Sequence, residues 1–243
     1  MKRREFINNT ATLGLVMAAA SLPVAVAKEL FLGDDQPAKA ETPAKLTPPA
    51  NGAIPVAFAI SEGVTVIDFC GPWEVFQDVM RPGGGGGAFD LFTVSEKTEQ
   101  LLGSAGLKLV PDYTFENAPA PKVIVIPAQR GSTALHAWLR KMLPATDVTM
   151  SVCTGAFQLA KAGLLSGKSA TTHHDFIDRL AKMYPDINVK RGLRFVEGEK
   201  ISTAGCLTSG IDLALRVVDR YFGRETAQNT AFYMEYQSKQ WIV

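Results

Sequence analysis

Short apolar runs alternate along the chain with segments whose apolar residues recur at helical spacing. Pro55–Ile60 and Val123–Pro127 have no polar face, which is typical of strands buried on both sides of a sheet. Phe89–Val94 alternates apolar and polar residues like a strand, and the strand Val148–Val152 runs almost directly into a helix over Ala156–Ala160. Strands that alternate with helices in this way favour a mainly parallel sheet covered by helices on both faces.

The same patterning predicts the remaining elements. We expect a helix to begin near Pro72, with an apolar stripe from Trp73 to Val79, and to end at Arg81-Pro82. The run Gly83–Gly87 that follows is interpreted as a flexible loop, because it lacks the Lys-Ser/Thr ending of a phosphate-binding loop and follows a helix instead of preceding one. The other expected elements are helices over about 133–143, Ser209–Tyr221 and Glu225–Tyr236, and short strands around Ala170–Thr172 and within 192–203.

The first 27 residues have the pattern of an export signal. Arg3 and Arg4 form a twin-arginine pair, and an uncharged apolar stretch runs from about Ala11 to the small-x-small ending Ala25-Val26-Ala27. The segment resembles a twin-arginine (Tat) signal peptide, which implies a protein located in the periplasm or secreted. Two alternatives are a buried helix and an uncleaved membrane anchor. Because Pro23 breaks an apolar run that is already shorter than the roughly 20 residues of a span, we expect no stable membrane insertion after cleavage.

Composition narrows the class of protein further. Residues 28–52 carry four prolines among Ala, Lys, Thr and Glu and are expected to form a linker, so that the folded domain spans 53–243. Apolar residues make up 47% of the chain and charged residues 20%, as in an ordinary globular protein. With 25 Lys and Arg against 24 Asp and Glu, the net charge of +1 argues against a nucleic-acid partner. Three Cys and three His without ligand spacing predict neither a disulfide scaffold nor a metal site.

The likeliest place for chemistry follows from the expected topology. In open parallel sheets, ligands bind beyond the carboxyl ends of the strands. The segments that directly follow predicted strands are Ser61–Cys70, Ala128–Gly131, Cys153–Gly155, His173–His174 and Ala204–Thr208.

One of these turns carries a cysteine in a position typical of a nucleophile. The absence of a gap between the strand ending at Val152 and the helix after Gly155 requires a tight turn at Cys153, the geometry of a nucleophile elbow. Facing the start of a helix, the thiolate is expected to have a lowered pKa, and main-chain N–H groups there can hold an anion on the substrate. The alternative is a small buried cysteine that fills space before a helix.

Several segments in order resemble one protein family. The elbow Val152–Phe157, followed by Ala162–Gly167, resembles the ThiJ/PfpI superfamily and, within it, the isonitrile hydratase-like branch. The further matching segments are Ile67–Phe76, Ala170–His173, Tyr184-Pro185, Thr203–Gly205 and Gly210–Leu215. The resemblance runs from about Pro55 to Glu235 and implies a three-layer α/β sandwich, flavodoxin-like and of the class I glutamine amidotransferase-like type. It also implies a small-molecule substrate, no cofactor and a homodimer.

The resemblance assigns catalytic roles to three residues. Cys153 matches the nucleophile, Asp68 matches the acidic residue that handles protons beside the sulfur, and Thr154 matches the neighbour of the nucleophile. From the residues alone, an aspartate after a buried strand in apolar surroundings is expected to have a raised pKa, which suits an acid/base. The alternative for Asp68 is a helix N-cap before Gly71-Pro72.

Four residues are assigned to binding. His173 follows a strand and is expected near Cys153, either as a partner or as a structural residue, since Thr154 stands where many superfamily members have a histidine. Ala128 and Gln129 stand where the family often has two glycines, one of which donates an N–H to the oxyanion site, and Gly155 offers a further N–H at the helix start. His174 is expected to begin the next helix, and His136 to lie at the surface or in packing.

Two more cysteines lie at turns of the same edge. Cys70 and Cys206 are either small packing residues or a disulfide that modulates the reactivity of Cys153.

Three functions remain open: hydration of an isonitrile, another cysteine-dependent reaction such as amide, thioester or glyoxal chemistry, and a non-catalytic periplasmic ligand-binding or redox-sensing domain. The family fold also serves as the sensing half of AraC-type regulators. The absence of an appended helix-turn-helix module and the export signal make a transcription regulator the least expected.

Overall fold

The computed structural model describes residues 43–81 and 87–243. The predicted signal peptide, the first part of the predicted linker and most of the glycine run lie outside the described residues. The described linker residues are extended and attach to the domain: Leu46 N–H donates to the carbonyl of Arg220 (2.8 Å), and Leu46 also packs on the apolar core. Arg81 donates to the carbonyl of Gly52 at 2.7 Å. Within these ranges, no helix has both the length and the apolar character that crossing a membrane requires.

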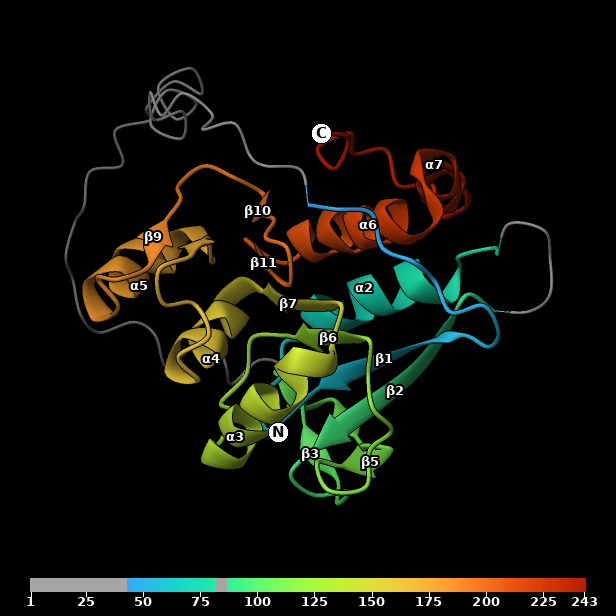
Figure 1. The fold of residues 1–243 in the computed structure, drawn as a ribbon. Coiled ribbons are helices and arrows are strands. Elements are labelled where there is room, and N and C mark those ends of the chain that lie inside the picture. Colours follow the sequence, from blue (N-terminus) through green and yellow to red (C-terminus); the bar gives the residue numbers. More distant parts are fainter. Residues whose placement is uncertain (1–42, 82–86) are drawn as a thin grey trace, which may run out of the picture. The chain divides into compact units, whose positions relative to one another are not determined.

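A central sheet organises the described residues (Figure 1). Its strands pair in parallel except for the antiparallel pair of β10 with β11. In spatial order, the strands described are β10 (Phe195–Val196), β11 (Ile201–Ala204), β7 (Val148–Val152), β6 (Val123–Ile126), β1 (Ile54–Ala59), β2 (Phe89–Ser95) and β5 (Tyr113–Thr114). This arrangement confirms the predicted mainly parallel α/β sandwich.

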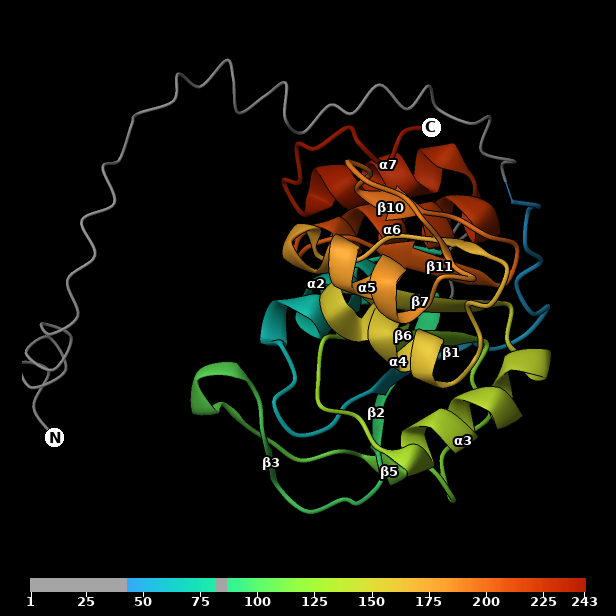
Figure 2. The same ribbon diagram turned by 90° about the vertical axis from the view of Figure 1, so that its left-hand side faces the viewer.

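Helices cover both faces of the sheet. The α-helices described are α2 (Val66–Gln77), α3 (Thr133–Met142), α4 (Ala156–Lys161), α5 (Ile177–Met183), α6 (Ser209–Phe222) and α7 (Arg224–Tyr233). Single 3₁₀ turns are η1 (Ser104–Gly106), η2 (Leu143–Ala145), η3 (Cys153–Gly155) and η4 (His174–Phe176). Helices α6 and α7 lie on one side of the sheet and α3 on the other (Figure 2).

Strand residues alternate between two apolar clusters, because successive side chains point to opposite faces. On β1, Val56 and Phe58 join the cluster under α2 and α6, whereas Ala57 and Ala59 join the cluster under α3 and α4. Five of the six residues of β1 are fully buried, and the exception is Pro55. This burial explains the continuous apolar run in the sequence.

The first helix differs from its prediction. Helix α2 begins at Val66, six residues before Pro72, so Pro72 lies inside the helix. Proline is favoured at a helix start, which is why the sequence suggested one there. Inside α2, Pro72 has no N–H for the carbonyl of Asp68, but its buried ring faces Gly210 of α6, where a Cβ would lie 3.3 Å from Pro72 Cγ.

Several short elements escaped the sequence analysis. They are β5, β9 (Asn188–Val189) and the antiparallel ladder of β3 (Leu101–Leu102) with β4 (Lys108–Leu109). The strand predicted around Ala170–Thr172 is β8 (Ser169–Ala170), which pairs in parallel with β9. Ladders of two residues are too short to show a period in the sequence. The strands and helices that position the candidate site were predicted within a few residues of their observed bounds, apart from the start of α2.

Candidate active site

Cys153 lies at the sharp turn between β7 and α4. Its φ of 57° is in the left-handed region, which is uncommon for a residue with a Cβ and confirms the tight turn expected from the sequence. The Cys153 N–H donates to the carbonyl of Gly205 (2.6 Å), and its own carbonyl accepts from Thr172 Oγ1 (2.9 Å). The turns that follow β11 and β8 therefore hold the strained residue from two sides.

Gly155 makes the turn possible by packing. A Cβ at this position would lie 2.1 Å from the carbonyl oxygen of Ile126 and 2.9 Å from that of Pro127. The φ of Gly155 is −54°, so close approach to the end of β6, and not an unusual backbone conformation, requires glycine here. The sequence analysis placed Gly155 in binding; the structure adds this steric reason for its presence.

Asp68 reaches the same edge from the first turn of α2. The side chain is fully buried, and its Oδ2 accepts a hydrogen bond from the Ala128 N–H at 3.1 Å. The N-cap of α2 is Thr65, so the alternative of Asp68 as a helix cap is wrong. The other carboxyl oxygen, Oδ1, is buried and has no hydrogen-bond partner of good geometry within the described residues.

Asp68 and Cys153 influence each other's protonation. Burial raises the pKa of Asp68 from 3.8 to about 6, while the Ala128 N–H and the neighbouring Cys153 thiol lower it. The pKa of Cys153 is raised to about 12, first by burial and then by the charge of Asp68, whereas the N–H groups of Thr154 and Leu207 lower it. At neutral pH the pair is therefore a thiol beside a carboxylate.

The raised thiol pKa corrects the expectation of a thiolate stabilised by a helix. The helix after the turn is short, a 3₁₀ turn followed by only six residues of α4, so its dipole is weak. Cys153 is only 6% exposed, and its nearest carboxylate opposes a second negative charge. Any reaction at this sulfur therefore starts from the protonated thiol.

The loop after β6 uses the Ala128 N–H, which the sequence assigned to the oxyanion site, within the protein. The Ala128 N–H is used by Asp68, that of Arg130 by the carbonyl of Glu62 (3.1 Å), and that of Gly131 by Ser61 Oγ (3.0 Å). This loop therefore orients Asp68, and the N–H groups facing the sulfur come from Thr154 and from Leu207, which the sequence analysis had not singled out. The φ of Leu207 is 40°, a second strained residue at the site.

Gln129 faces away from the sulfur and toward β1. Its Nε2 donates to the carbonyl of Ala59 (2.7 Å), and its buried Oε1 has no partner within the described part of the chain. Gln158 of α4 anchors the same loop, since its Nε2 donates to the carbonyls of Gln129 (3.0 Å) and Arg130 (3.2 Å). His136 Nε2 lies 2.9 Å from Gln158 Oε1, in keeping with the packing role expected of His136.

His173 and His174 lie beside the site as a stacked pair. Their ring centroids are 4.3 Å apart, and His174 begins η4 as predicted. His173 caps this turn, with Nδ1 accepting the Asp175 N–H at 3.2 Å. Within the described residues, no hydrogen bond joins His173 to Cys153, so this geometry gives no support to a Cys–His pair.

The other two cysteines are free thiols. Cys70 and Cys206 are both partly buried, and no disulfide joins them. Cys206 is close enough to Cys153 that its charge raises the pKa of the Cys153 thiol, so Cys206 belongs to the surroundings of the site.

The described surface also carries a groove of about 850 Å³ beside α7, which none of the predicted site residues lines.

Known proteins resemble this chain in sequence and in fold. A model of the DJ-1/PfpI family matches residues 55–220. Isonitrile hydratase of Pseudomonas putida is 32% identical over 190 residues, which cover 76% of this chain and 79% of that protein. The HTH-type transcriptional regulator CdhR of Pseudomonas aeruginosa is 33% identical over 133 residues, 52% of this chain and 39% of the regulator. A crystal structure of a ThiJ/PfpI family protein from Pseudomonas syringae superposes with a TM-score of 0.66 at 25% identity, covering 86% of this chain and 83% of that chain.

Proposed function

We propose, from the premise that the chain belongs to the DJ-1/PfpI family, that it is a cysteine-dependent enzyme that hydrates an isonitrile to an N-substituted formamide. One observation carries the proposal: Cys153 is held in a strained turn beside the buried carboxyl of Asp68, whose pKa is about 6. Similarity to the isonitrile hydratase of Pseudomonas putida supports the choice of substrate class.

The first half of the proposed reaction forms a covalent thioimidate. The Asp68 carboxylate removes the thiol proton as the Cys153 sulfur bonds to the terminal carbon of the isonitrile, R–N≡C. The protonated Asp68 then delivers that proton to the same carbon, which gives R–N=CH–S–Cys153 without net charge. A carboxyl group with a pKa of about 6 suits both directions of transfer, because neither protonation state is strongly favoured near neutral pH.

The second half consumes water and restores the thiol. Water adds to the thioimidate carbon while Asp68 moves one proton from the water to the nitrogen. The resulting R–NH–CH(OH)–S–Cys153 then breaks its carbon–sulfur bond, the hydroxyl proton passes through Asp68 to the sulfur, and the formamide R–NH–CHO leaves. The N–H groups of Thr154 and Leu207 face the sulfur, so they stabilise its charge as it attacks and departs. Thr154 is partly exposed beside Cys153, and we assign its side chain to the substrate or the attacking water.

Limited access to the sulfur favours a slender electrophile. Cys153 is 6% exposed, whereas Cys206 and Leu207 across the turn are partly exposed. The carbon of an isonitrile is terminal and lies at the end of a linear group, so it reaches such a sulfur more easily than an amide carbon that carries two substituents. This argument distinguishes isonitrile hydration from amide hydrolysis on the same turn.

The test is turnover of cyclohexyl isocyanide by the purified protein, followed by NMR of the formamide. We expect product from the wild-type protein, none from Cys153→Ala, and unchanged turnover from the matched control Cys70→Ala. Absence of formamide with the wild-type protein, or full turnover by Cys153→Ala, would contradict the proposal.

A second candidate function is ligand or redox sensing without turnover. It is favoured by the neutral, buried thiol of Cys153 and by the regulators among the similar proteins. Selective oxidation of Cys153 by mild peroxide, seen by intact mass, together with no covalent adduct across a panel of isonitriles, amides, thioesters and glyoxals would support it. A covalent adduct with an amide or thioester alone would instead indicate another cysteine-dependent reaction.

We also propose that residues 1–27 direct export by the Tat pathway, on the strength of the twin-arginine pair and the small-x-small ending. Replacing Arg3 and Arg4 with Lys should retain the protein in the cytoplasmic fraction, and export of that variant at the wild-type level would refute the proposal.

A homodimer is proposed as well, because Phe232 and Tyr233 on α7 are 86% and 64% exposed. Light scattering after size exclusion should give twice the chain mass, falling to one chain mass in Phe232→Ser.

A further inference from the structure

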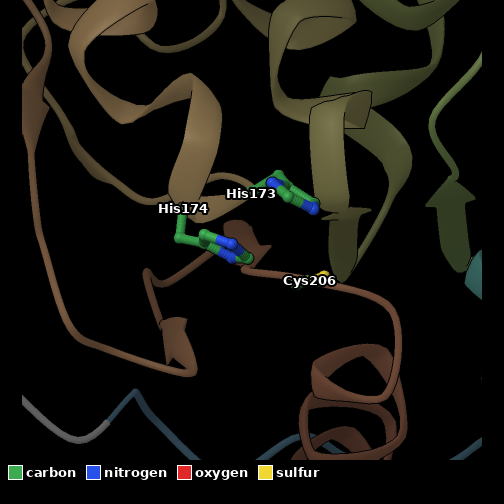
Figure 3. Close-up of side chains that lie close together, drawn as sticks. All are labelled: His173, His174 and Cys206. Atoms are coloured by element: carbon green, nitrogen blue, oxygen red, sulfur yellow. The ribbon is translucent and has the colours of Figure 1, made fainter. Parts of the chain in front are cut away.

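Three metal-ligating side chains meet at the edge of the site without any role in the proposed reaction. His173 and His174 come from the turn after β8, and Cys206 comes from the turn after β11 (Figure 3). One ligand atom from each residue lies within 4.8 Å of the other two. The sequence predicted no metal site because the cysteine is more than thirty residues from the histidines, outside any local ligand spacing.

We propose that His173, His174 and Cys206 bind a divalent cation of borderline softness, of which Zn²⁺ is the type. Two imidazole nitrogens and one thiolate are ligands that Zn²⁺ prefers, and three protein ligands leave a fourth position for water or another donor. Tetrahedral coordination with the usual Zn–N and Zn–S bond lengths places ligand atoms roughly 3.4–3.7 Å apart. The observed spacing therefore requires side-chain movements of about 1 Å, and the two turns are at the surface, where such movements are small adjustments.

Asp175 supports both histidines in the way a metal site requires. Its Oδ2 lies 3.7 Å from His173 Nδ1, and its Oδ1 lies 3.3 Å from His174 Nε2. The opposite nitrogens, Nε2 of His173 and Nδ1 of His174, are then the ligand atoms we assign. His173 Nδ1 accepts the Asp175 N–H at 3.2 Å, which fixes the orientation of the ring and leaves Nε2 for the ion.

The charges around Cys206 also favour a cation. The negative charges of Asp68 and Asp175 act on Cys206 and favour a positive ion beside it, whereas the positive charge of Arg194 opposes one.

The proposed ion would join two turns that already hold Cys153. The carbonyl of Gly205, one residue before Cys206, accepts the Cys153 N–H, and Thr172, one residue before His173, donates to the Cys153 carbonyl. Because the ion binds only when both turns are in place, it should raise the thermal midpoint of unfolding, and the stabilisation should grow with the logarithm of its concentration over its dissociation constant.

The test uses Co²⁺ as a spectroscopic substitute for Zn²⁺, added to the untagged protein. We expect one Co²⁺ per chain, a thiolate-to-cobalt charge-transfer band, and visible bands of a four-coordinate ion, all displaced by Zn²⁺. The band should disappear in Cys206→Ser and persist in the matched controls Cys70→Ser and Cys153→Ser. In Asp175→Asn the affinity for Zn²⁺ should fall about ten- to a hundred-fold.

Folding of each variant is checked by circular dichroism. His174→Ala serves as the second probe of the site, because the His174 side chain is 57% exposed and its removal leaves the core untouched; we expect at least a ten-fold loss of Co²⁺ affinity. No charge-transfer band with the wild-type protein, a band that survives in Cys206→Ser, or loss of the band in Cys153→Ser in place of Cys206→Ser would each overturn the proposal. None of these readouts depends on turnover, so the metal site and the proposed function are tested separately.

Discussion

Replacing Asp68 with Asn should stabilise the protein at neutral pH while abolishing turnover. The carboxyl of Asp68 is fully buried, and no cation pairs with it among the described residues. An Asn side chain has nearly the same shape, and its carbonyl oxygen can still accept the Ala128 N–H that Asp68 Oδ2 accepts now. The substitution therefore removes the buried charge and keeps the neighbouring hydrogen bond.

The magnitude follows from the pKa of the group. Folding raises the pKa of Asp68 from 3.8 to about 6, so at neutral pH ionisation costs the folded state about 3 kcal/mol relative to the unfolded chain, at 1.36 kcal/mol per pKa unit. The sign is that of an acid with a raised pKa: between 3.8 and about 6 the folded state binds more protons than the unfolded state. Stability is therefore lost as pH rises through this window, and none of the cost remains below it.

The assay is urea unfolding of wild type and Asp68→Asn at pH 4 and at pH 7.5. We expect the free energy of unfolding of the variant, relative to wild type, to be greater at pH 7.5 than at pH 4 by roughly 2 kcal/mol, because pH 4 lies just inside the window between 3.8 and about 6. Comparing the two pH values removes any constant effect of the amide itself.

A matched control is Asp212→Asn. Asp212 is equally buried, but it pairs with Arg194 and accepts from Tyr236 and Ser238. Losing that charge leaves Arg194 without its partner, so the control should be less stable than wild type at pH 7.5. If Asp68→Asn shows no gain between the two pH values, the carboxyl is not ionised in a buried site and the acid/base reasoning fails.

Three further predictions test the site. The value of kcat/KM for isonitrile hydration should rise with pH to a plateau, with a midpoint near the Asp68 pKa of about 6; a flat profile would exclude Asp68 as the base. Gly155→Ala should unfold the domain or sharply lower its thermal midpoint, because the new Cβ would lie 2.1 Å from a main-chain oxygen of β6, whereas Gly205→Ala, with its nearest atom at 3.4 Å, should stay close to wild type. Gln158→Leu leaves two loop carbonyls without donors and should cost about 2–3 kcal/mol in chemical denaturation, against about 1 kcal/mol for His136→Ala, which removes one bond; equal costs would contradict the anchoring role.

The buried strands and the tight turn at Cys153 could be predicted from the sequence. The period of apolar residues is local, so Val123–Ile126 and Val148–Val152 were recognisable as buried strands. Likewise, a helix that follows a strand without a gap must turn tightly, and Cys153 does so with a φ of 57°. Both features depend only on residues that are neighbours in the chain.

The start of α2 is a position where the local preference of a residue does not decide the structure. Pro72 favours a helix start, yet the helix begins at Val66, and Pro72 inside it packs on α6 near Gly210, a segment far away in the sequence. The loop after β6 differs for a similar reason: Asp68 accepts the Ala128 N–H that the sequence assigned to the substrate, and the Gln129 side chain donates to the carbonyl of Ala59 in β1.

The protonation of the Cys153 thiol and the meeting of the three proposed metal ligands depend on the tertiary structure alone. The motif around Cys153 suggested an ionised thiol, but burial and the charge of Asp68, which is 85 positions earlier in the printed sequence, raise the pKa of that thiol to about 12. The meeting of His173 and His174 with Cys206 likewise depends on how the turns after β8 and β11 come together. Strand patterns and tight turns depend on residues that are neighbours in the sequence. A pKa or a set of metal ligands depends on which groups the folded chain places within a few ångströms of one another.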